Sequence, residues 1–218
     1  MNKLKTLRPA VATLLSLTVF CALAQATNHV KIRATLPAFE VLGQVNNFAG
    51  APPTSQQFGY LSSVTGIDNV YSAASPQNES TAQLTFFTQA TTLSTKIDGP
   101  LKIVNRTATT TIYLNSAPAS FANPDSFRSG QPVQVSSMTQ QVVIDTVSGV
   151  FTVVNVNTVT ESSVFELNGG DVRLGREGDQ FRTILTGHLN TGLVVGGPAG
   201  WFGGYAVGMS REEREDRD

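Results

Sequence analysis

The chain has 218 residues, 40% of them hydrophobic and 14% charged, with 15 basic and 16 acidic side chains. Its length is sufficient for one domain with its own hydrophobic core. The basic residues are scattered, which excludes the basic stripe that nucleic-acid binding requires.

The first 26 residues are interpreted as a secretory signal peptide. Three basic residues lie within the first eight, residues 11–23 are apolar, and Ala24-Gln25-Ala26 supplies small residues at a cleavage site, with Ala22-Leu23-Ala24 as an alternative. The apolar stretch is shorter than a membrane span of about 20 residues, so we expect cleavage and no stable membrane span. The protein is therefore expected to be secreted or periplasmic.

Cleavage after Ala26 removes Cys21, the one cysteine of the chain, and predicts a disulfide-free mature protein. Lipid attachment at Cys21 is disfavoured, because Phe20 stands where a lipid-attachment site has a small residue. Loss of the three leader cations leaves 12 basic against 16 acidic residues, a net charge of −4.

The mature chain is rich in Thr, Val, Ile and Phe in short runs broken by Gly, Pro, Asn and Asp, which predicts strands and no helix. Residues 29–36 alternate between apolar and polar side chains and are predicted to form the first strand. Residues 39–53, which end in two prolines, are predicted to form a surface loop. A second strand is expected at 58–67 and a second loop at 68–80.

Residues 81–97 and 101–115 are predicted to form a long hairpin around Asp98-Gly99, because this dipeptide favours the positive φ angles of tight turns. The apolar positions change parity near 86–87 in the first arm and near 105–107 in the second. We expect a bend there, with each half of the hairpin facing a different core.

A second hairpin is predicted from 133–147 and 150–160 around Gly149, and both faces of its arms are apolar. Its outer face therefore requires a cover, either a facing sheet and loop or a neighbouring subunit. A third hairpin is expected within 163–174 around Asn168–Asp171. Later strands are expected at 180–190 and within 193–208.

These elements predict an all-β, antiparallel fold in which residues 27–208 form a single domain and residues 209–218 form a charged, flexible tail. A small β-barrel of about eight strands is preferred over a β-sandwich, because long bent hairpins favour closure and closure removes exposed edges. An outer-membrane barrel is disfavoured because residues 88–95 are polar on both faces. The expected architecture is similar to lipocalin-type and allene-oxide-cyclase-type barrels, as a likeness of fold without a shared motif.

The sequence contains no catalytic constellation that we can identify, and we expect no metal and no cofactor, since its two histidines have no further ligands at metal spacing. The candidate ligand-binding residues are Trp201, Tyr205, His188 and Phe181. Aromatic side chains among glycines suit either the rim of a ligand site or a packed core.

Two hypotheses of function follow. The first is a non-enzymatic secreted domain that acts through surface interaction or self-assembly, with a homo-oligomer as the expected partner state. The alternative is a small barrel that binds, or isomerises, an apolar small molecule. A cavity of about 300 Å³ or more that reaches Tyr205 or His188 would favour the alternative.

Overall fold

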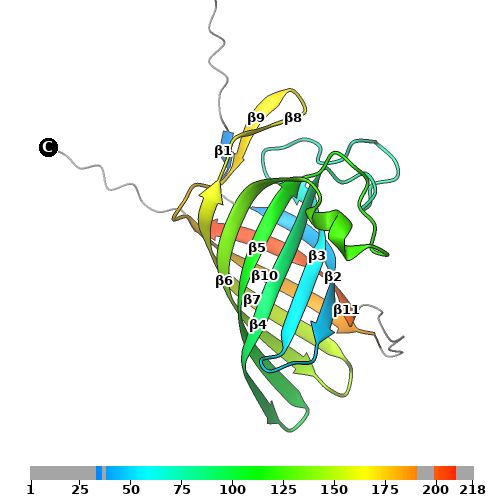
Figure 1. Cartoon of the computed structure of the whole chain (residues 1–218), viewed down its shortest axis with the longest axis vertical. Helices are drawn as coiled ribbons and strands as arrows, with labels where there is room; N and C mark the ends of the chain where they lie inside the picture. Colours follow the sequence, from blue (N-terminus) through cyan, green and yellow to red (C-terminus); the bar gives the residue numbers. More distant parts are fainter. Residues whose placement is uncertain (1–32, 36–37, 191–198, 210–218) are drawn as a thin grey trace, which may run out of the picture.

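The computed structural model describes residues 33–35, 38–190 and 199–209, and in this part of the chain nearly every element is a β-strand (Figure 1). Eight strands close into an antiparallel barrel in the order β10-β11-β2-β3-β4-β5-β6-β7, with β7 paired back to β10. They are β2 (Phe39–Phe48), β3 (Thr54–Val64), β4 (Leu84–Asp98), β5 (Leu101–Leu114), β6 (Gln131–Asp145), β7 (Val150–Ser162), β10 (Gln180–Leu189) and β11 (Gly200–Met209). The prediction of a small antiparallel barrel rather than a sandwich is confirmed.

A separate three-stranded sheet packs at one end of the barrel, the upper end in Figure 1. It consists of β1 (Arg33–Thr35), β9 (Gly170–Leu174) and β8 (Phe165–Leu167), with β1 parallel to β9. Leu174 is fully buried, and its carbonyl oxygen accepts a hydrogen bond from the side-chain amide of Gln134 on β6. The small sheet thus belongs to the same buried cluster as the barrel core.

The predicted hairpins are present, and their turns have the expected chemistry. Gly99 (φ 54°) joins β4 to β5, Gly149 (φ 74°) joins β6 to β7, and Asn168 and Gly169 (φ 55° and 75°) join β8 to β9. The Asp145 carboxylate accepts hydrogen bonds from the Ser148 hydroxyl and from the backbone N–H groups of Val147 and Ser148, and these bonds lower its pKa. Local turn preferences are therefore sufficient to position these three connections.

The predicted loop at 39–53 is wrong in most of its length, because residues 39–48 form β2, a central strand of the barrel wall. Gly43 and two asparagines lower the intrinsic strand preference there. Pairing with β3 and β11 outweighs that preference, and Gly43 lets the rings of Phe86 and Phe202 approach the backbone.

Several predictions fall partly or wholly outside the described residues. These are the leader at 1–26, residues 29–32 and 36 of the first predicted strand, residues 193–198 of the last predicted strand, and the tail from residue 210. Within the described residues, β1 covers 33–35 and β11 covers 200–209, which agrees with strands at both places. The predicted loop at 68–80 contains no strand apart from isolated bridges.

The expectation that each half of the β4–β5 hairpin faces a different core is wrong. Val104 and Ile112 are both even-numbered and both buried, so the buried face of β5 carries even-numbered residues before and after 105–107. Leu93 and Ile97 are 67% and 72% exposed, on arms that extend beyond the barrel wall (Figure 1). The bend is a bulge at Leu93, where the register with β5 shifts.

Candidate functional site

The barrel interior is divided by a polar crossbar of three buried side chains, Gln57 on β3, Gln140 on β6 and Asn155 on β7. The amides of Gln57 and Gln140 exchange hydrogen bonds of 3.1 and 3.2 Å across the barrel. Gln140 Nε2 also donates to Asn155 Oδ1 at 3.0 Å. Because buried amides are costly unless they are hydrogen-bonded, this set pairs polar groups that face the core.

Two small cavities lie on either side of the crossbar. The upper cavity, of about 40 Å³, faces the small β1–β9–β8 sheet and is lined by rings such as Phe39, Phe86 and Phe181 together with Thr183 and Asn157. The lower cavity, of about 30 Å³, faces the β4–β5 and β6–β7 hairpins. Each holds roughly two or three water molecules, well below the roughly 300 Å³ of small-molecule pockets.

The lower cavity combines an apolar wall with a cationic side chain. Val142, Phe151 and Leu185 contribute to its wall, and the guanidinium of Arg106 on β5 lies beside Asn47 and the crossbar. Arg106 Nη1 donates to Gln140 Oε1 at 3.2 Å, and Nη2 donates to Asn47 Oδ1 at 3.1 Å. Burial lowers the pKa of Arg106.

The four residues selected from the sequence do not converge on one site. Phe181 points into the barrel and lines the upper cavity, where its ring packs edge-on against Phe39. His188, Trp201 and Tyr205 lie on the outer wall, in β10 and β11. His188 Nδ1 lies 2.6 Å from the carbonyl oxygen of Leu189. His188 and Trp201 are direct cross-strand neighbours, whereas Tyr205 pairs with Ile184 further along the same wall.

The outer wall formed by β7, β10, β11 and β2 carries apolar side chains, here named the apolar outer face, in cross-strand rows that the row of Thr152, Thr186 and Gly203 separates. In cross-strand register, Val154 is beside Ile184 and Ile184 is beside Tyr205. Its members are 37% to 51% exposed: Leu42, Val150, Val154, Ile184, Trp201, Tyr205 and Val207. Within the described residues, nothing covers this face, and it includes the outer side of β7, the second arm of the second predicted hairpin.

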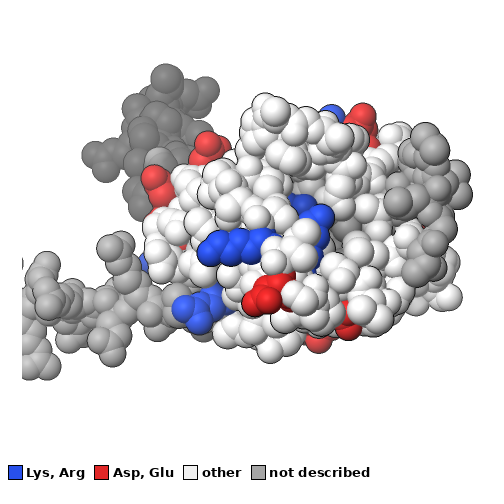
Figure 2. Space-filling model, turned by 90° about the horizontal axis from the view of Figure 1, so that it is seen from below, with Lys and Arg blue, Asp and Glu red and all other residues white. Residues whose placement is uncertain are grey.

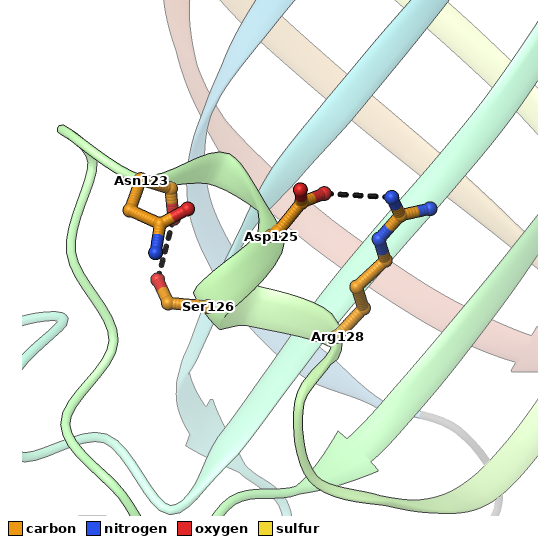
Figure 3. A network of polar contacts seen from close by, with 4 residues as sticks. All are labelled: Asn123, Asp125, Ser126 and Arg128. Atoms are coloured by element: carbon orange, nitrogen blue, oxygen red, sulfur yellow. Dashed lines mark hydrogen bonds and ion pairs between the residues drawn. The ribbon is translucent and has the colours of Figure 1, made fainter.

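The neighbouring wall, over β3 and β4, is covered by the connection 115–130 that contains the short 3-10 helix η1 (Pro124–Arg128). Phe127 is fully buried and packs against Phe58 and Phe121. The helix is held by a hydrogen bond of 2.6 Å from Ser126 Oγ to the Asn123 carbonyl oxygen and by an ion pair of 2.7 Å between Asp125 and Arg128 (Figure 3). We call this connection the aromatic cap.

The aromatic cap and the apolar outer face meet at one residue. The ring centroid of Phe121 lies 4.7 Å from that of Trp201, with an interplanar angle of 60°. Trp201 thus borders the cap on one side and the exposed wall on the other. The tryptophan that was selected as a candidate for the rim of a cavity lies at the rim of a surface patch.

Sequence reasoning did not select Arg106, Gln57 or Gln140. A signal was available for Arg106, because its position shares the parity of Val104, Ala108 and Ile112 and a charged residue at an inward parity is unusual. No such signal marks the two glutamines as partners, because they are 83 residues apart.

Among the described residues, no group of three or more His, Cys, Asp or Glu side chains could hold a metal ion. In the same part of the chain, no helix is long and apolar enough to cross a membrane. No family model, curated protein or solved structure matches the chain. The geometry of the barrel therefore carries the functional argument.

Proposed function

We propose that this protein is a non-enzymatic β-barrel domain that is exported from the cell and acts through its outer surface, by pairing with a second copy through the apolar outer face. The observation that carries this proposal is the run of half-exposed apolar side chains in adjacent strands, centred on Ile184 and Tyr205. Monomeric proteins rarely expose continuous apolar patches, and such patches mark interaction sites. The small size of both interior cavities favours the surface over the interior.

A second copy is the occupant that the charges of this face favour. Arg182 on β10 pairs with Val207, and Glu40 on β2 pairs with Tyr205, so the two charges lie on opposite sides of β11. A two-fold axis along β11 sets β10 of one copy over β2 of the other, which brings Arg182 toward Glu40 twice. Self-complementarity of this kind is what a symmetric dimer requires.

The proposal is tested by native mass spectrometry and sedimentation velocity of the exported protein. We expect a mass that begins after residue 26 and a dimer whose Ile184→Glu variant dissociates at least 10-fold more readily. Leu93→Glu is the matched control, because it places the same charge at an exposed leucine outside the apolar outer face, and it should leave the dimer unchanged.

Charge reversal then tests the orientation of the two copies. Glu40→Arg and Arg182→Glu should each weaken the dimer, because each places like charges opposite one another, and the double variant should restore it. A wild-type monomer at concentrations up to about 100 μM, where a micromolar interface is saturated, contradicts the proposal. A dimer that is insensitive to Ile184→Glu places the interface elsewhere.

A further inference from the structure

The guanidinium of Arg106 lies inside the barrel wall with more donors than partners. A guanidinium has five N–H groups, and two hydrogen bonds, to Gln140 and Asn47, are made by its terminal nitrogens. Its Nε is buried and has no hydrogen-bond partner. A buried donor without a partner is unfavourable relative to one that is paired, so this N–H group can accommodate a further acceptor.

Arg106 also lacks a countercharge. Both of its partners are neutral amide oxygens, and among the described residues no carboxylate forms an ion pair with it. Arginine keeps its charge even where burial lowers its pKa. A partly buried cation without an opposite charge is unfavourable, and a bound anion would relieve this cost.

The lower cavity provides room and chemistry for such an anion. Its volume of about 30 Å³ has room for roughly two or three water molecules, so it admits the carboxylate group of an acid rather than the whole molecule. Beyond Arg106 and the amides of Asn47, Gln57 and Gln140, the walls are aliphatic or aromatic, with Val142 and Leu189 among them. Figure 2 views this end of the barrel and shows Lys and Arg side chains near the middle of the face, with Asp or Glu side chains beside them.

We propose that the lower cavity binds the carboxylate of a small aliphatic monocarboxylic acid, with Arg106 as its charge partner. The Asn47 side-chain oxygen Oδ1 accepts from Arg106, which leaves the Asn47 NH₂ group as a second donor at the rim. One guanidinium among neutral amides neutralises one negative charge, which favours a monoanion over a dianion. The aliphatic and aromatic part of the lining favours a short alkyl chain beside the carboxylate over a polar one.

The test is an NMR titration of the exported protein with sodium butyrate, at constant ionic strength maintained with sodium chloride. We expect saturable shifts of the Arg106 Nε–H signal and of the Gln57 and Gln140 side-chain amides, with a Kd on the order of 1–10 mM. Butan-1-ol, which lacks the charge, should bind at least 10-fold more weakly. This wild-type comparison does not depend on any variant being folded.

Variants assign the binding to Arg106. Arg106→Gln should weaken butyrate binding at least 10-fold, and Arg106→Lys should retain an intermediate affinity because the charge remains but the planar fork is lost. Lys96→Gln removes the same charge from an exposed position on the β4–β5 hairpin and should bind butyrate as the wild type does. Absence of saturable shifts, equal shifts with butan-1-ol, or unchanged binding by Arg106→Gln overturns the proposal.

Discussion

Gly187 on β10 shows how closely the barrel wall is packed at the level of one residue. A Cβ atom placed there would lie 2.2 Å from Cζ of Phe151 and 2.3 Å from the carbonyl oxygen of Trp201. The backbone oxygen belongs to the neighbouring strand and moves only if the strands separate. Gly203 on β11 provides a contrast, because a Cβ there would be 3.5 Å from its nearest neighbour, the Val41 carbonyl oxygen.

We therefore expect Gly187→Ala to destabilise the barrel by about 1–3 kcal/mol or more through overpacking. Gly203→Ala should change the free energy of unfolding by less than about 0.5 kcal/mol, since its methyl group has room. Urea unfolding of the two variants measures the difference. Equal stability of the two variants would contradict the close packing of Phe151 over Gly187.

The aromatic cap shows how a connection can become part of the core at the level of one element. It covers the outward side chains Phe58 and Phe87, so β3 is buried on both faces at 57–61 and β4 at 84–88. The guanidinium of Arg128 lies 4.6 Å from the ring centroid of Phe87 and adds a cation–π contact. This cover explains the change of parity at Phe86 and Phe87, because Phe86 faces the barrel interior and Phe87 faces the cap.

Phe127→Ala should remove the centre of the cap and lower the free energy of unfolding by about 3–5 kcal/mol, as expected for a fully buried phenylalanine. The fluorescence of Trp201, the one tryptophan of the chain, should change as well, because Phe121 would lose the ring that supports it. Phe48→Ala is the control, since Phe48 is 44% exposed at the end of β2. A loss no larger than that of the control would show that the cap does not stabilise the barrel.

The crossbar acts at the level of the whole molecule, because it connects walls that are far apart in sequence. Gln57 and Gln140 come from β3 and β6, which are not neighbours in the barrel, and their amides meet across the interior. Each amide donates one hydrogen bond to the other and accepts one from it. Loss of Gln140 therefore leaves Gln57 with an unpaired donor and acceptor, whereas loss of Gln57 leaves Gln140 with its bonds to Arg106 and Asn155.

A double-mutant cycle of Gln57→Ala and Gln140→Ala should give a coupling energy of about 0.5–3 kcal/mol, with the two single losses together exceeding the loss of the double variant. The cycle of Gln56→Ala with Gln140→Ala is the control, because the adjacent Gln56 lies on the outer wall and should couple weakly. Chemical unfolding supplies the free energies for both cycles. Additivity in the first cycle would contradict the crossbar.

Much of the barrel could be predicted from local patterns in the sequence. Alternating apolar residues identified the long strands, and Gly99, Gly149 and Asn168 marked turns that need positive φ angles. These signals act within a few residues, so they do not depend on the rest of the fold. Strand β2 was missed because its formation depends on pairing with β3 and β11 rather than on local sequence preference.

The candidate sites could be predicted only in part. Trp201 and Tyr205 attracted attention as aromatic residues among glycines, but which side of the wall they occupy depends on the register of β11 against β10 and β2. Arg106 and the crossbar were missed because their roles depend on hydrogen bonds to side chains that are distant in the sequence.

The sequence by itself determined the antiparallel β class, the hairpins and their turns, because backbone preference and alternation are encoded locally. Only the tertiary structure decided which face of each strand is inside, which walls the aromatic cap covers and that Arg106 lies in the lower cavity. These features depend on the closure of the barrel, which brings together residues more than 80 positions apart, such as Gln57 and Gln140. No pattern within one strand contains that information.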